Sequence, residues 1–236
     1  MNNRGRRKIL LLIMVMSLLL TISPLTGLAE RDTVSESGEV FSTDFSEYEV
    51  GKGVPEGWKE LWQTSLYEIA ESPSRLIKTS TGENRHLLAW EDVGIVEGDV
   101  EVATLMRVPG DTLPNLETTA FQLHLHTGGM TRAIDTYHLD YTGTNRQGLR
   151  IRRSVHNDQT TLASENEPFT LHTWHHVVFQ RHGDMLRAKI WPYNTEEPDE
   201  WTIEAEDDTH HSGYVGIGFY SERHTQEFAW FSVGTG

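Results

Sequence analysis

The chain has 236 residues, 37% of them hydrophobic, with seven tryptophans and no cysteine, a composition that excludes an intrinsically disordered or a disulfide-built protein. Residues 1–29 carry four of the 20 basic residues and none of the 35 acidic ones, so the remainder has 16 basic against 35 acidic residues and a formal net charge of −19. This excess argues against nucleic acid or an anionic membrane as the main partner, because both attract positively charged surfaces.

The N-terminus has the pattern of an export signal. Basic residues between Arg4 and Lys8 precede an apolar run, and Gly27-Leu28-Ala29 offers the small side chains that signal peptidase requires. The apolar run of about twelve residues is short for a membrane span, which needs about 20. We therefore expect a signal peptide at 1–29 and a secreted or extracytoplasmic protein with no membrane span after cleavage. An uncleaved N-terminal anchor is the alternative.

Residues 30–39 are polar and are expected to form a flexible lead-in. From residue 40 onward, short segments alternate apolar and polar residues and end at Gly, Pro, Asn or Asp. The expected strands are 100–108, 121–126, 137–141, 149–152, 175–180, 185–191 and 214–219. This period of two, repeated along the chain with no helical period, predicts an all-β, antiparallel two-sheet sandwich over residues 40–236. Apolar contexts place four tryptophans in the expected core: Trp58, Trp62, Trp174 and Trp230.

Three parts of the chain resemble the concanavalin A-like lectin/glucanase jelly rolls, in their laminin G-like version. These parts are the opening from Phe41 to Trp58, the segment from Trp174 to Trp191, and the ending from Gly213 to Thr235. In the middle part a tryptophan begins a strand and a tight hairpin leads to the next one. The resemblance covers residues 40–236 and implies a jelly-roll fold. It does not imply one function, because this fold carries glycosidases, lyases, lectins and adhesive modules.

Glu97, Asp99 and Glu101 have the spacing of the Glu-x-Asp-x-Glu strand that glucanases of this fold use, since residues at i, i+2 and i+4 share one face of a strand. Gly98, however, stands where the relatives have an apolar residue, and the segment around it has the composition of a turn. We therefore favour a turn over a catalytic strand. The segment Gln122-Leu123-His124 resembles the Gln-Ile-His segment of alginate lyases, without the other motifs of that family.

His124 and His126 lie two residues apart in an expected strand, so their side chains point the same way and can share one metal ion. His138 in the following strand would supply a third imidazole, with Asp140 close by. The chain holds 12 histidines along its length, so such pairs also arise without a metal. Because alternation places these histidines opposite apolar neighbours, we favour solvent-facing polar positions over a metal centre.

Polar residues of several strands are expected to face outward if each strand buries its apolar set. An open jelly-roll groove is where relatives bind glycans. Arginine, histidine and glutamine donate hydrogen bonds to sugar hydroxyls or carboxylates, and tryptophan offers a stacking surface. We expect a ligand site that favours acidic polymers, formed by Gln122, His124, His126, His138, Arg150, Arg152, Gln180, Arg187, Lys189 and Trp191. An ordinary solvated sheet face is the alternative.

The resemblance also implies a structural Ca²⁺, which many members of the fold hold with an opening aspartate and an acidic residue near the C-terminus. Asp44 matches the opening position, whereas Ala229 and Trp230 stand where many relatives have an acid. Main-chain oxygens can compensate, because calcium accepts them readily. The hypothesis of Ca²⁺ at Asp44 therefore stands beside a second one, in which Asp44 caps the entrance of a strand.

Taken together, these features predict an exported, non-catalytic jelly-roll module that binds a carbohydrate or a cell-surface glycan. The alternative is a polysaccharide-cleaving enzyme of the same fold. It would be either a glycoside hydrolase that uses the carboxylates around Asp99 or a polysaccharide lyase that uses the strand of His124. The residues carry no signal for an oligomeric state.

Overall fold

The computed structural model describes residues 38–62, 66–71, 73–79, 84–110, 119–128, 133–142, 148–166, 169–221 and 225–236. The expected signal peptide at 1–29 and the lead-in up to residue 37 lie outside the described residues. Every described element is a β-strand. Within the described ranges, no helix has the length and apolar character needed to cross a membrane.

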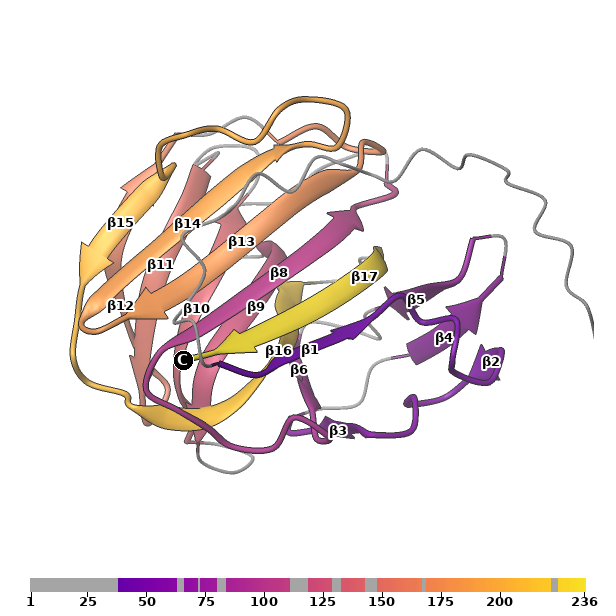
Figure 1. Cartoon of the computed structure of the whole chain (residues 1–236), viewed down its shortest axis with the longest axis horizontal. Helices are drawn as coiled ribbons and strands as arrows, with labels where there is room; N and C mark the ends of the chain where they lie inside the picture. Colours follow the sequence, from indigo (N-terminus) through magenta and orange to yellow (C-terminus); the bar gives the residue numbers. More distant parts are fainter. Residues whose placement is uncertain are drawn as a thin grey trace, which may run out of the picture. The chain divides into compact units, whose positions relative to one another are not determined.

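The strands form two antiparallel sheets, which we call sheet I and sheet II (Figure 1). Sheet I contains, in spatial order, β15 (Ile203–Glu206), β14 (Met185–Pro192), β13 (His175–His182), β8 (Val100–Arg107), β17 (Thr225–Thr235), β5 (Arg75–Thr79), β4 (Leu66–Ala70) and β2 (Gly51–Lys52), while β1 (Val40–Thr43) also pairs with β17. Sheet II contains, in spatial order, β12 (Asp158–Glu165), β11 (Gly148–Val155), β10 (Asp135–Thr142), β9 (Thr119–Gly128), β16 (Ser212–Ser221), β6 (Asn84–Trp90) and β3 (Trp58–Glu60), while β7 (Val96–Glu97) also pairs with β16.

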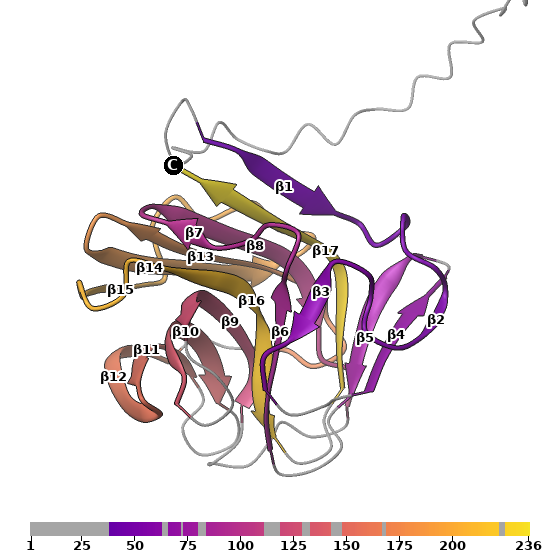
Figure 2. The ribbon, with the colours of Figure 1, turned by 90° about the horizontal axis from the view of Figure 1, so that it is seen from below.

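The core lies between the two sheets. Figure 2 separates the layers, with β13 and β14 in one and β10 and β11 in the other. Alternation places Val177 and Phe179 of β13 and Leu139 and Tyr141 of β10 in one continuous hydrophobic cluster, where each is at most 1% exposed. Because the chain has no cysteine, burial of this apolar surface is the main source of its cohesion.

The predicted all-β jelly-roll sandwich is confirmed, but the strands between residues 51 and 90 were not expected, and neither were β7, β12 and β15. Several of them are short, so they offer little alternation to recognise. In β6, the residues from Leu87 to Trp90 are all buried, at no more than 6% exposure. A strand buried on both faces reads as a continuous apolar run, which periodicity cannot distinguish from other buried segments.

Candidate functional site

The outer face of sheet II gathers six polar residues on the neighbouring strands β9, β10 and β11. Their register aligns them in two rows that run across the three strands. The rows are Gln122–Asp140–Arg150 and His124–His138–Arg152. The sequence predicted that these residues face away from the core, and the alternation with buried apolar neighbours confirms it.

Asp140 is the centre of this face, and its side chain is fully buried. Arg150 Nε donates to Asp140 Oδ1 at 2.7 Å, and Arg152 Nη1 donates to Oδ2 at 3.2 Å. A buried carboxylate requires such pairing, because an uncompensated charge in the interior is costly. The two guanidinium side chains are 16% and 17% exposed, and no described acceptor lies within hydrogen-bond reach of Arg152 Nε. Asp140 therefore holds two arginines in fixed positions, and because Arg152 Nε is closed to solvent, a ligand can reach only the terminal nitrogens of that guanidinium.

The two histidines of the second row form a closed layer beside the arginines. The rings of His124 and His138 are stacked with centroids 5.4 Å apart, and His124 Nδ1 lies 3.3 Å from Thr136 Oγ1. The expectation that these positions face solvent is wrong, since neither histidine exceeds 6% exposure. Trp62 and His86 line the same space and leave a cavity of only about 10 Å³. Further lining residues that the sequence analysis did not identify are Thr136, Ser154 and Gln159.

His126 does not join these rows. The register of β9 against β10 shifts at this point, and His126 has a positive φ of 48°. Its Nδ1 donates instead to the carbonyl oxygen of His210 at 3.1 Å. Burial lowers the pKa of His126 to about 4, and nearby positive charge at Arg181 contributes to the shift. A bulge thus redirects the side chain, and the described residues contain no cluster of three or more side chains arranged to hold a metal ion.

The other predicted ligand residues lie on sheet I, so a single groove that joins all ten is wrong. Gln180, Arg187, Lys189 and Trp191 belong to β13 and β14, which the chain reaches after it leaves sheet II at β12. Period-two alternation assigns a face of a strand but not the sheet to which the strand belongs.

Internal partners hold the cations on this face of sheet I. Arg187 Nε donates to Gln180 Oε1 at 2.6 Å, and Gln180 Nε2 donates to Glu101 Oε2 at 2.9 Å. Lys189 Nζ donates to the carbonyl of Pro198 at 2.6 Å. These residues thus hold the polar part of the sheet face together, and Arg187 and Lys189 are less suited to a ligand than the arginines of sheet II.

The carboxylate triad is not formed, and the turn interpretation is confirmed. Glu97 ends β7, which pairs with β16, whereas Glu101 lies in β8 of sheet I. Gly98 between them has φ of 74°, a left-handed conformation that favours glycine. Asp99 Oδ1 accepts a hydrogen bond from the backbone N–H of Gly183 at 2.8 Å. The three carboxylates therefore do not share one face of a strand.

Asp44 follows β1 directly and is exposed. Its Oδ1 accepts hydrogen bonds from the backbone N–H of Ser46 at 3.0 Å and from the Ser46 hydroxyl at 2.5 Å. These two bonds lower the pKa of the Asp44 carboxyl. Asp44 thus caps the turn that follows β1, at the end of a strand and not at the entrance of one as the alternative to calcium binding predicts. Binding of Ca²⁺ at Asp44 stays a prediction.

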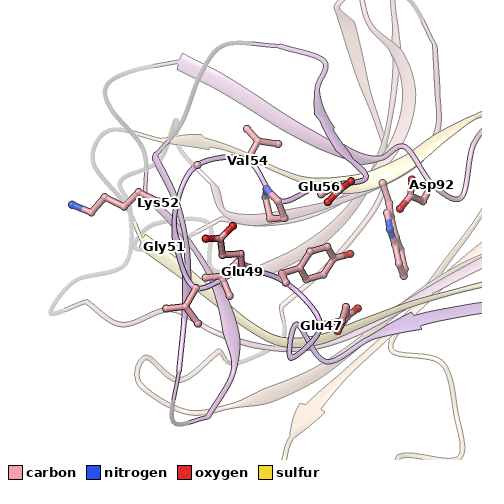
Figure 3. Close-up of a pocket in the computed structure, with 13 residues that line it drawn as sticks. Glu47, Glu49, Gly51, Lys52, Val54, Glu56 and Asp92 are labelled. Carbon is pink, nitrogen blue, oxygen red and sulfur yellow. The ribbon is translucent and has the colours of Figure 1, made fainter. Parts of the chain in front are cut away.

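A wide pocket of about 820 Å³ lies beside the segment from Glu47 to Glu56. Figure 3 shows the carboxylates of Glu49, Glu56 and Asp92 around it, with the amine of Lys52 pointing away from them. The sequence carries no sign of this pocket, because most of its residues belong to an irregular segment with no period. Its acidic lining makes it unsuited to an acidic ligand.

Comparisons with known proteins support the fold. No family model and no curated protein matches the sequence. Among solved structures, the carbohydrate binding module CBM66 from Bacillus subtilis has a TM-score of 0.54 and 12% identity over 73% of this chain and 91% of that one. The carbohydrate recognition domain of Emp46p, in its metal-free form, has a TM-score of 0.52 and 8% identity over 75% and 87%. A xylan β-1,4-xylosidase from Bacillus halodurans C-125 has a TM-score of 0.53 and 11% identity over 81% of this chain and 38% of that one. At these identities the similarity establishes the fold alone.

Proposed function

We propose that this chain is an exported, non-catalytic carbohydrate-binding module, and that a glycan with carboxylate groups binds to the outer face of sheet II at Arg150 and Arg152. The observation that carries the proposal is the buried Asp140, which fixes two partly exposed guanidiniums side by side. The fold that the chain shares with a carbohydrate binding module and a carbohydrate recognition domain supports it.

The chemistry of this face suits an acidic sugar. A guanidinium offers paired donors in a fixed plane, which match the two oxygens of a uronate carboxylate. The edge strand β12 adds exposed hydroxyl groups, since Thr161 lies opposite Arg152 and Ser164 lies opposite Arg150. Hydroxyl groups beside each arginine can bind the neutral oxygens of the same sugar.

The test is isothermal titration with a hexamer of polygalacturonate and with neutral hexasaccharides. Arg152→Ala should weaken binding of the acidic hexamer about tenfold, a loss of about 1.4 kcal/mol. Arg187→Ala removes the same charge from the other sheet and should leave binding unchanged. Added salt should weaken binding of the acidic hexamer, because the arginines are partly exposed to solvent. Equal losses for the two variants, or none for Arg152→Ala, would contradict the proposal.

The second candidate function is that of a polysaccharide-cleaving enzyme. The observation that favours it is the position of Gln122 and His124 on the same face as Arg150, with His124 Nε2 3.4 Å from Gln122 Oε1. A lyase would release unsaturated sugars, and a hydrolase would release reducing ends. Either product from polygalacturonate or a neutral glycan, lost in His124→Ala, would replace the binding function with an enzymatic one.

Binding of Ca²⁺ at Asp44 can be tested separately. If Asp44 is a ligand, chelation should lower the melting temperature, and Asp44→Ala should remove the difference. Millimolar calcium over a site with Kd of about 10 μM would stabilise the fold by about 2.7 kcal/mol. An unchanged melting temperature in chelator would leave Asp44 with its turn bonds to Ser46 alone.

A further inference from the structure

A row of large side chains crosses the outer face of sheet I. Trp191 of β14 is opposite His176 of β13, which is opposite Leu105 of β8, which is opposite Trp230 of β17. The row covers three strand spacings, about 14 Å. Its ring centroids are close, at 5.0 Å for Trp191–His176 and 6.0 Å for His176–Trp230.

This aromatic row is separate from the core between the sheets. Trp191 forms a small hydrophobic cluster with Ala103 and Val178, and Trp201 and Trp230 pack against that cluster. The rings of His176 and Trp230 are partly exposed. An outer sheet face is usually polar, so aromatic rings gathered there indicate a surface that meets a ligand or partner.

The row ends beside a shallow, open hollow. Trp230 lines a hollow of about 670 Å³ together with Ser42, Thr43, Asp44 and Glu47. In the pairing of β1 with β17, Thr43 lies opposite Phe231, which brings Asp44 alongside Trp230. Both carboxylates of the hollow are exposed, and the hydroxyl of Ser42 adds a further polar group. A stacking ring next to carboxylate acceptors and a hydroxyl is a combination suited to a sugar, which has an apolar C–H face and a rim of hydroxyl donors.

We propose that this row of large side chains, together with the hollow at Asp44, is a second glycan-binding surface and that it binds an extended neutral glycan. The sugar rings stack on Trp230 and His176, and Asp44 and Glu47 accept hydrogen bonds from their hydroxyls. The two carboxylates repel uronates, so this surface has the opposite charge preference to the arginines of sheet II. Trp191 and Leu105 are at most 8% exposed, so the stacking surface is formed by His176 and Trp230, and the hollow beside Trp230 extends it beyond one sugar ring. The proposal stands independently of the function assigned to sheet II.

The test is isothermal titration of the full exported chain with three neutral probes: cellohexaose, mannohexaose and xylohexaose. At least one should bind, and Trp230→Ala should weaken that binding about tenfold or more. Trp230→Phe keeps a ring and should retain affinity within about threefold. Asp44→Asn, whose side chain can still accept the Ser46 hydrogen bonds, should weaken neutral binding and relieve the exclusion of polygalacturonate hexamer from this face.

Two control variants separate this surface from the rest of the protein. Leu66→Ala truncates a 62% exposed apolar side chain on β4 of the same sheet and should leave the affinity for neutral hexasaccharides unchanged. Arg152→Ala should leave the affinity for neutral hexasaccharides unchanged while it weakens binding of the polygalacturonate hexamer. The two proposed surfaces can therefore be tested separately. Should Trp230→Ala fail to fold, as judged by its melting curve, His176→Ala replaces it.

Three outcomes would overturn the proposal. The first is that none of the neutral hexasaccharides binds the wild-type chain. The second is that folded variants at Trp230 or His176 bind as the wild type does. The third is that sedimentation shows a dimer that Trp230→Ala converts to monomers without any change in glycan binding, which would make this face a contact between two copies of the chain.

Discussion

The imidazole of His126 shows how burial sets the behaviour of one ionisable group. The side chain is 1% exposed, and its pKa is lowered from 6.5 to about 4 chiefly because burial disfavours the charged form. Below pH 6.5 the unfolded chain therefore binds a proton that the native chain rejects. The stability that this group contributes is complete above pH 6.5 and is lost as the pH falls through about 4.

The free energy of unfolding should consequently fall by about 3 kcal/mol between pH 7 and pH 4 on account of His126 alone. Burial also lowers the pKa of His175 and His210, which adds to the loss in the same direction. Urea unfolding at pH 7, 5.5 and 4 measures the free energy of unfolding, which should fall less steeply with pH in His126→Gln than in the wild type. Parallel profiles for wild type and His126→Gln would refute this assignment.

The strand β16 makes room for the polar rows of sheet II by means of a glycine. Gly218 lies opposite Gln122, and a Cβ added there would stand 2.5 Å from His124 Nε2 and 2.8 Å from the carbonyl oxygen of His86. Gly218→Ala should therefore lower the free energy of unfolding by about 1–3 kcal/mol, because side chain and backbone must both move. Gly234→Ala on β17 is the matched control, since its Cβ would meet open space. Equal stability of the two variants in urea unfolding would show that His124 yields without cost.

The whole chain is expected to act outside the cytoplasm, and the mass of the secreted protein tests that expectation. Signal peptidase should remove residues 1–29, because the small residues before Glu30 suit its active site. Intact-mass measurement of secreted material should give a mature chain that begins near Glu30. A mass that retains the leader would instead indicate an N-terminal anchor.

Much of the sheet II site could be predicted because alternation is a local property. Arg150 and Arg152 follow the same two-residue period as the buried Leu149 and Ile151, so their common face is readable from the sequence. The burial of His124 could not be predicted, because it depends on Trp62, a residue from a distant segment. The position of Trp230 was missed for a similar reason. Trp230, Trp62 and Trp174 were predicted to lie in the core, and none of the three belongs to it. The register of β17 directs Trp230 to the outer face beside Leu105.

The sequence by itself determined the all-β class, the two-residue alternation and the turn at Gly98, since each follows from the steric and hydrophobic preferences of neighbouring residues. Only the tertiary structure decided which strands share a sheet, that Asp140 pairs with both arginines, and that His126 turns away at a bulge. Those properties depend on contacts between segments far apart in the chain. No local pattern encodes them, because the register between strands is chosen by the packing of the complete core.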